Sequence, residues 1–283
     1  MHNAYCVKKF STQHETRNTN PMLNTPRSFR VEAVVLRHRD WGEADRLVTL
    51  YTRQRGKIRA VAKGARKIRS RKAGHLEPFI QVTLQLARAR GPFIITQAET
   101  INAYLPLRED LALTGYASYV AELLDRFSYD EEESNISLFN LLTDSLTRLA
   151  RGDKPWLAMR YYEMRLLDHL GFRPRLFECA NCAAEIKAED QFFSAAQGGV
   201  LCPSCGASLP DARPVDVKTL KYLRHFQRSS YADAQRAHPD PVIQNKVENL
   251  MQYYLTYLLE RGLNSPRFLK EVSRTKTEKT ERG

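Results

Sequence analysis

No run of apolar residues in this chain is long enough to span a bilayer. Residues 1–27 are polar, rich in Asn and Thr, and lack the apolar middle of a secretory signal. Both absences argue against a membrane-spanning or exported protein. We therefore expect a cytoplasmic protein whose 283 residues suffice for two domains, or for one domain with a substantial insert.

Motifs for catalysis are also missing. The chain contains neither the P-loop pattern G-x-x-x-x-G-K-[ST] nor the metalloprotease pattern H-E-x-x-H. Its seven histidines are dispersed, and His75, His169 and His225 show no metal-type pairing. Acidic residues cluster only at 130–133, between two expected helices. We find no set of residues suited to chemistry and expect a protein that is not an enzyme.

Acidic residues are absent between Asp45 and Glu77. The whole chain has 44 Lys and Arg against 32 Asp and Glu, a net charge of +12. This excess favours a polyanionic partner, nucleic acid first and an anionic membrane surface second. A solvated basic surface is the alternative that charge alone leaves open. The acid-free stretch holds eleven basic residues: Arg46, Arg53, Arg55, Lys57, Arg59, Lys63, Arg66, Lys67, Arg69, Arg71 and Lys72.

The residues from Phe29 to about Ala103 have the pattern of short β-strands. Val82, Leu84 and Leu86 alternate with polar residues, which predicts a strand with one buried and one wet face. Five strands joined by turn signals in about seventy-five residues predict a small closed or nearly closed barrel, and an SH3-like barrel would give a similar pattern. The expected strands are 30–36, 46–51, 57–62, a run that follows Pro78, and 93–96.

Lys57 and Arg59 on the expected strand 57–62, and Lys63 just after it, lie an even number of residues apart from one another. Side chains at every second position of a strand point to the same face, so these three should share one face. Residues 63–72 continue as a basic loop. A barrel face with such a loop would form an electrostatic groove for phosphates. Four nearby aromatic residues could stack on bases, although each alone is more typical of a core: Trp41, Tyr51, Phe79 and Phe93.

Beyond Pro106 the apolar period becomes helical. Glycine at 171 and at 262 is expected to end two of the helices. The expected helices are 111–127, 136–149, 156–170, 215–227 and 242–261.

Cysteine is scarce, at five residues, but four of the five form two C-x-x-C pairs separated by nineteen residues. Each pair places two sulfurs on one tight turn, and two such turns can surround a tetrahedral zinc ion. Four cysteine ligands leave no open coordination position, so this zinc would be structural. Two redox-active pairs or four free thiols are the alternatives, and Cys6 stands alone. The expected zinc ligands are Cys179, Cys182, Cys202 and Cys205.

Four segments of the chain resemble the RecO DNA-repair proteins. Together they span residues 29–269, and the second is the most specific. The segments are VVLRHRDWGEADR (34–46), TRQRGKIRAVAKGAR (52–66), LLDHLGFRP (166–174) and LNSPRFL (263–269).

The resemblance implies an α+β multidomain fold: an N-terminal OB-fold barrel, then an all-α domain with an inserted four-Cys zinc-binding subdomain. It implies binding to single- and double-stranded DNA and strand annealing. With RecR, such proteins assist loading of RecA onto DNA coated by single-stranded-DNA-binding protein, whose acidic C-terminal tail they bind through the helical domain. The implied location is cytoplasmic and nucleoid-associated. The family's DNA surface falls on Lys57, Arg59, Lys63 and Arg66, and charge alone extends it to Lys67, Arg69, Arg71 and Lys72.

The domain boundaries that follow from these patterns begin with a disordered extension, in which Met22 is a candidate translation start. A zinc-ribbon nuclease or RNA-modifying enzyme is the alternative function, and a protein adaptor with an incidental basic surface is a third. The expected parts are 1–28 (disordered), 29–103 (barrel), 104–178 (first helical part), 179–209 (zinc-binding insert), 210–270 (second helical part) and 271–283 (disordered tail).

Overall fold

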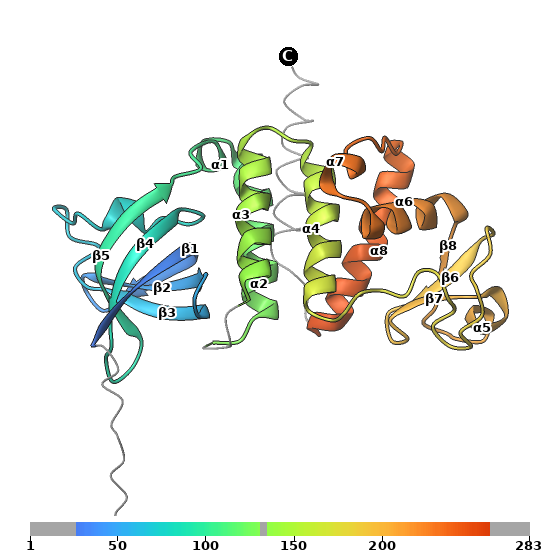
Figure 1. Ribbon diagram of the computed structural model, residues 1–283, viewed down its shortest axis with the longest axis horizontal. Helices are drawn as coiled ribbons and strands as arrows, with labels where there is room; N and C mark the ends of the chain where they lie inside the picture. Colours follow the sequence, from blue (N-terminus) through green and yellow to red (C-terminus); the bar gives the residue numbers. More distant parts are fainter. Residues whose placement is uncertain (1–26, 131–134, 261–283) are drawn as a thin grey trace, which may run out of the picture.

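The N-terminal part of the chain forms a closed five-stranded barrel (Figure 1). The computed structural model describes residues 27–130 and 135–260. The strand order is β1-β2-β3-β5-β4, and β1 closes the barrel by pairing with β4. This order, with β3 parallel to β5, is that of the expected OB-fold. The strands are β1 (Ser28–Trp41), β2 (Asp45–Thr52), β3 (Gly56–Ala62), β4 (Gln81–Ala87) and β5 (Phe93–Asn102).

The first strand is longer than its apolar run. Its first half, Ser28–Val34, pairs with β4, whereas Ala33–Trp41 pairs with β2. A register shift between Val35 and Arg37 marks the point where the strand changes neighbours, as bulges do at barrel corners. The second half is polar, so the hydrophobic pattern predicted only residues 30–36 of it.

The helical domain follows the barrel (Figure 1). The expected helix 111–127 is confirmed, and Asp110 begins it by accepting hydrogen bonds from two backbone N–H groups. Within the described ranges, no helix has the length and apolar character needed to cross a membrane. The helices are α1 (Pro106–Glu109), α2 (Leu111–Phe127), α3 (Ile136–Ala150), α4 (Pro155–His169), α6 (Val217–Arg228), α7 (Tyr231–Ala234) and α8 (Pro241–Leu259).

A small sheet with the order β7-β6-β8 carries the cysteine region between α4 and α6. A hairpin lies between the two cysteine pairs, since β6 and β7 are antiparallel. The third strand extends this sheet to Val215, beyond the insert boundary expected at 209. The elements are β6 (Gln191–Ser194), β7 (Gly199–Leu201), α5 (Pro203–Ala207) and β8 (Arg213–Val215).

The described residues contain two separate hydrophobic cores. One fills the barrel interior. The other is shared by the helices, the cysteine-bearing sheet and a few barrel residues such as Val34 and Tyr51. In this second core the ring of Phe193 is edge-on to that of Tyr254, with 5.4 Å between the ring centroids. The sheet therefore depends on the helices, whereas the barrel interior is packed independently. The extension 1–26, the translation start at Met22 and the tail 271–283 lie outside the described residues, and Ser28 already belongs to β1.

A buried ion pair lies in the helical core. The Arg160 Nη2 and Glu163 Oε1 atoms of α4 are 2.5 Å apart, with side chains 4% and 0% exposed. The Tyr119 hydroxyl of α2 donates to the same carboxylate. Burial raises the pKa of Glu163 to about 7, although Arg160 and Tyr119 oppose the shift. Because charges buried this deeply depend on their partners, the pair constrains how α2 packs on α4.

Replacement of Glu163 by Gln is expected to change how stability depends on pH. The carboxyl has its ordinary pKa of 4.5 in the unfolded chain and a pKa of about 7 in the folded one, so the folded state holds the proton over that interval. Stability should therefore fall as pH rises from 4.5 to 7, and the Gln variant should lack this part of the slope. Denaturant unfolding at several pH values measures it. The exposed Glu109→Gln variant is the control, and equal slopes in parent and Glu163→Gln would contradict the assignment.

Candidate metal centre and nucleic-acid interface

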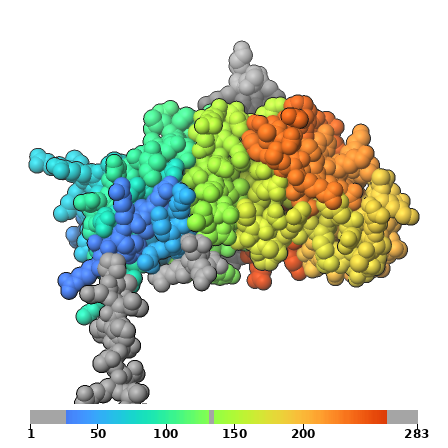
Figure 2. Space-filling view, in the orientation of Figure 1, coloured from blue at the N-terminus to red at the C-terminus, as the bar shows by residue number. Residues whose placement is uncertain are grey.

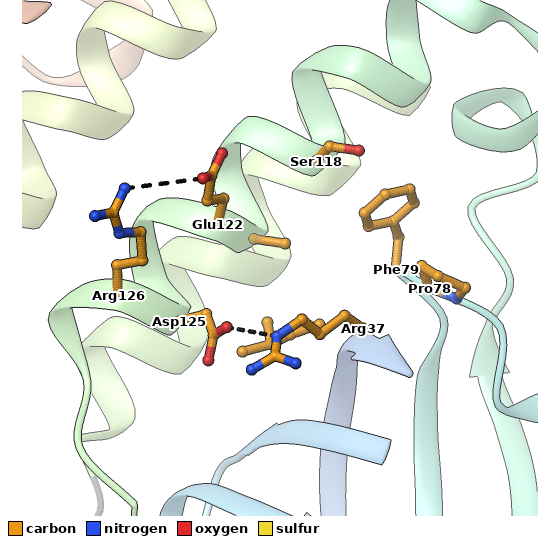
Figure 3. Close-up of a pocket in the computed structure, with 9 residues that line it drawn as sticks. Arg37, Pro78, Phe79, Ser118, Glu122, Asp125 and Arg126 are labelled. Carbon is orange, nitrogen blue, oxygen red and sulfur yellow. Dashed lines mark hydrogen bonds and ion pairs between the residues drawn. The ribbon is translucent and has the colours of Figure 1, made fainter. Parts of the chain in front are cut away.

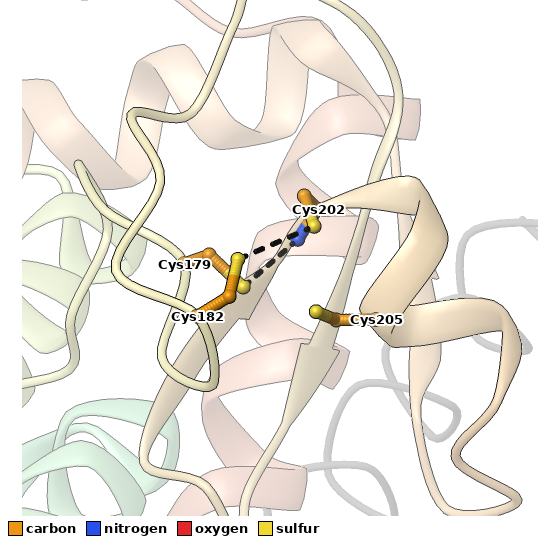
Figure 4. Close-up of side chains that lie close together, drawn as sticks. All are labelled: Cys179, Cys182, Cys202 and Cys205. Atoms are coloured by element: carbon orange, nitrogen blue, oxygen red, sulfur yellow. Dashed lines mark hydrogen bonds between the residues drawn. The ribbon is translucent and has the colours of Figure 1, made fainter.

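The four cysteines of the two C-x-x-C pairs converge at one point (Figure 4). Their sulfur atoms all lie within 4.8 Å of one another, and Cys182 Sγ is 3.9 Å from Cys202 Sγ. The first pair lies in the turn before β6, whereas Cys202 caps α5 and Cys205 lies within it. Two tight turns are thus brought face to face by the β6–β7 hairpin.

This arrangement fits a tetrahedral zinc ion. Zinc–sulfur bonds of about 2.3 Å place the sulfurs of a tetrahedron about 3.8 Å apart. Backbone support is present, because the Cys202 N–H donates to Cys179 Sγ at 3.4 Å. Such contacts orient metal ligands. All four thiols are free, so no disulfide joins them. The four residues would hold one zinc ion with no open coordination position.

The environment of Cys179 favours a thiolate. Burial alone raises the pKa of this thiol, but hydrogen bonds from the backbones of Cys182, Cys202 and Asn181 outweigh it and lower the pKa to about 6. In contrast, a hydrogen bond from Asn181 lowers the pKa of Cys205, but hydrogen bonds with the neighbouring thiols outweigh it and raise the pKa to about 11. Four thiols this close cannot all ionise without a cation between them. A metal cation between the sulfurs would allow all four to act as thiolate ligands.

Lys57 is not on the surface of the barrel. Its side chain is 10% exposed, and its Nζ lies 2.7 Å from Asp125 Oδ1 of α2. The same Nζ donates to the carbonyl oxygens of Asp125 and Ser128, at 2.5 and 3.0 Å. Arg37 of β1 donates to Asp125 Oδ2 at 2.7 Å (Figure 3). Burial alone raises the pKa of Asp125, but these two donors lower it below its usual range.

These contacts give Lys57 a structural role, and its expected contact with DNA stays a prediction. Lys57 lies on the strand face expected from its position, but that face meets the C-terminal end of α2. A cation at this end satisfies carbonyl groups that the helix leaves unpaired. Lys57 therefore joins the barrel to the helical domain, and reversing its charge would disturb the fold.

A pocket of about 440 Å³ lies beside this contact, between the barrel and α2 (Figure 3). Leu36 and Phe79 contribute apolar lining. Its charged groups pair with one another: Arg37 with Asp125, and Arg126 with Glu122. The pocket therefore has a balanced charge and gives no indication of an ionic ligand.

The basic loop 63–72 is fastened to the β1–β2 turn at its start. The Gly64 N–H donates to Asp45 Oδ1 at 2.7 Å. Arg66 donates through Nη1 to the Glu43 carbonyl oxygen at 3.1 Å, and its Nη2 lies 3.3 Å from Asp40 Oδ2. Arg66 therefore positions the loop, although its side chain is 38% exposed.

The other end of the loop is fastened to β5. Lys72 Nζ donates to the Ile95 carbonyl oxygen at 3.1 Å. Between these anchors the loop projects from the barrel on the side away from the helices, at the left edge of Figure 1 and Figure 2 (cyan). Within 27–130 and 135–260, four exposed cations of this region have no ion-pair or hydrogen-bond partner through their side chains: Lys63, Lys67, Arg69 and Arg71.

Arg59 lies on β3 and is exposed, but it is paired. Its Nη2 is 2.7 Å from Asp130 Oδ2, which lies just beyond α2. A phosphate would have to compete with this carboxylate. The structure thus separates the eight expected DNA contacts into the interdomain Lys57, the paired or anchoring Arg59, Arg66 and Lys72, and the four unpaired cations.

The aromatic residues near the loop are not equivalent. Tyr51 and Phe79 are buried, at 2% and 5% exposure, so neither is available to a base. Trp41 is 43% exposed at the β1–β2 turn. Ile68 was not among the expected contacts, but it is fully exposed between Lys67 and Arg69 at the loop tip. The only feature of the sequence that could have indicated Ile68 is its position as an apolar residue inside a basic run.

Comparisons with known proteins agree along the chain. Residues 27–104 match the family profile described as Recombination protein O N terminal, and residues 108–267 match Recombination protein O C terminal. DNA repair protein RecO of Roseiflexus sp. (strain RS-1) is 41% identical over 246 residues, 87% of this chain and 86% of the relative. DNA repair protein RecO of Bifidobacterium longum (strain NCC 2705) is 36% identical over 243 residues, which cover 85% of this chain and 98% of the relative.

The matched residues cover the barrel, the helices and the cysteine-bearing sheet. Both the strand order of the barrel and the four-Cys cluster agree with the expected features. This chain therefore belongs to the RecO family of DNA repair proteins.

Proposed function

We propose that this protein binds DNA through the barrel loop 63–72 and anneals complementary strands. The observation that carries the proposal is the set of four exposed, unpaired cations on a loop whose two ends are anchored. Phosphate contacts by such cations release counterions, so binding should weaken steeply with salt. The anchors reduce the conformational entropy that the loop loses on binding.

Annealing requires no catalytic side chain. Two DNA strands repel each other as polyanions, and a cationic surface lowers that repulsion. Holding both strands on one protein also raises their effective concentration. The fully exposed Ile68 at the loop tip can contact a base while the neighbouring cations contact phosphates. Apolar side chains at such positions insert between base steps in other DNA-binding proteins.

The partners proposed for this activity are RecR and single-stranded-DNA-binding protein, whose tail would recruit the protein to coated single strands. Loading of RecA would follow. The zinc ion would act only in folding. A magnesium-dependent nuclease would need clustered carboxylates. In the parts of the chain that the structure describes, the one cluster able to hold a metal is the four cysteines.

The double variant Arg69→Glu/Arg71→Glu tests the DNA surface. We expect affinity for a short labelled single strand to fall about tenfold at low salt, because two phosphate contacts become repulsive. The slope of log K against log salt should decrease by roughly one to two, since each single-strand contact contributes about 0.7. Fluorescence anisotropy across a salt series measures both quantities.

The control is Arg151→Glu/Lys187→Glu, which reverses two exposed cations of the helical and cysteine-bearing parts and gives the same net charge. Equal affinity in the two double variants would place the DNA surface elsewhere. Strand cleavage in the presence of Mg²⁺ would instead support the nuclease alternative.

A further inference from the structure

A second cationic cleft lies in the helical domain, between α6 and the segment that joins α7 to α8. Its volume is about 580 Å³. Tyr222, Ala237 and Ile243 form its apolar part, and Ile243 is buried. The polar lining comes from both walls: Lys218, Lys221, His225, Arg236, His238 and Asp240.

The α6 wall is formed by one face of the helix. Lys218, Lys221, Tyr222 and His225 follow at the spacing of residues that share a helix face. Both lysines are exposed. In residues 27–130 and 135–260 neither lysine side chain has an ion-pair or hydrogen-bond partner. Two adjacent cations are thus available beside a half-buried aromatic ring.

The opposite wall is partly engaged within the protein. Arg236 lies 3.5 Å from Asp233 Oδ1 in an exposed ion pair. Asp240 accepts the Ile243 N–H at 2.9 Å as the N-cap of α8. His238 Nδ1 is 3.5 Å from Lys154 Nζ, which adds a further cation near the rim. The single lining carboxylate therefore has a structural role, and the cleft has an excess of positive charge.

Most of the charged groups in the lining are hydrogen-bond donors. Lysine and arginine side chains only donate hydrogen bonds, and Asp240 is the one acidic side chain in the cleft. A peptide brings a backbone N–H with nearly every residue and would need acceptors for it. A phosphodiester backbone brings acceptors and no donors, and its bases can stack on an aromatic ring. The chemistry of the cleft is thus better matched to a nucleic-acid strand.

We propose that this cleft binds a second single strand of DNA, with phosphates on Lys218 and Lys221 and a base against Tyr222. The inference rests on the proposed function, because annealing requires two strands on one protein. In Figure 1, α4 lies between the barrel and the helices α6 and α7. The two DNA strands would therefore bind on different domains. Two separate sites keep the strands bound together without competing for the same cations.

The test is the double variant Lys218→Glu/Lys221→Glu of the full, zinc-loaded chain. Arg151→Glu/Lys187→Glu again provides a control of equal net charge. The measurements are the number of oligothymidine strands bound per chain, by native mass spectrometry at low salt, and the annealing rate of two complementary strands. A strand carrying 5-iodouracil tests by ultraviolet crosslinking whether a base reaches Tyr222.

We expect two strands per parent chain and one strand for the cleft variant, with annealing about tenfold slower because the second strand is no longer held. Affinity for the first strand should stay within about twofold. Crosslinking to Tyr222 should occur in the parent and be lost in the variant. Because Lys218 and Lys221 are exposed, the melting temperature should not change.

Three results would overturn the proposal: two strands per chain in the cleft variant, annealing equal to that of the control, or no crosslink at Tyr222 in the parent. An acidic peptide that binds the parent, but not a variant that still anneals normally, would assign the cleft to a protein partner. Failure of the proposed barrel surface is separate, because it would appear as normal first-strand binding by Arg69→Glu/Arg71→Glu.

Discussion

The Cys179→Ser variant is expected to lose zinc and to unfold the cysteine-bearing sheet. Cys179 is 1% exposed and lies within the core shared with the helices. Structural zinc contributes about 10–16 kcal/mol in small zinc-binding peptides, where binding and folding are coupled. Loss of even part of this energy would exceed what the small sheet, with only three short strands, can supply by packing.

The measurable results are zinc content and thermal unfolding. Purified parent protein should carry about one equivalent of zinc, and the variant close to none. The melting temperature of the helical transition should fall by on the order of 10 °C, since the sheet packs on α8 through Phe193 and Tyr254. The barrel interior belongs to the other core, so first-strand DNA binding should persist.

Cys6→Ser is the matched control, because Cys6 lies outside the C-x-x-C pairs. It should retain zinc and melt like the parent. A Cys179→Ser protein that keeps one equivalent of zinc and its melting temperature would remove the basis for the metal centre.

Reversing the charge of Lys57 is expected to have the second large effect, and the effect should be on stability. In Lys57→Glu a carboxylate would face Asp125 and the carbonyl oxygens that now accept from Nζ. Breaking a buried ion pair costs about 3–5 kcal/mol, and a repulsive replacement costs more. The melting temperature should fall by on the order of 10 °C as the barrel separates from α2.

Arg59→Glu is the matched control on the same strand. The change in net charge is identical, but the Arg59 side chain is 48% exposed and pairs with an exposed carboxylate. Exposed pairs contribute about 0–1 kcal/mol, so this variant should melt close to the parent. Differential scanning calorimetry of both variants separates the two roles. A Lys57→Glu protein as stable as the parent, with DNA binding selectively lost, would return Lys57 to the DNA surface.

Several features of the protein could be predicted because their signals are local. The alternation of Val82, Leu84 and Leu86 specifies the buried face of β4 within seven residues. The apolar spacing of 111–127 and the cap at Asp110 determine α2. Likewise, the spacing of the four cysteines requires only that two turns meet, which the hairpin after Cys182 allows.

Features that depend on distant neighbours could not be predicted in this way. The polar half of β1 is a strand because β2 pairs with it, and no apolar pattern marks it. Strand β8 lies beyond the insert boundary expected at 209, and a strand of three residues is defined only by its pairing with β6.

The sequence by itself determined which residues are basic, which can bind zinc, and where strands give way to helices, since these depend on side-chain type and on spacing over a few residues. The tertiary structure decided where each cation lies and which groups it pairs with. Lys57 and Arg59 are two residues apart on one strand, so their spacing predicts the same face for both. Lys57 is nevertheless buried by the end of a helix 68 residues further along the chain. The tertiary structure also places Lys218 and Lys221 opposite Arg236 and His238 in one cleft. Burial and partners are set by packing between distant segments, and that information is not present in local spacing.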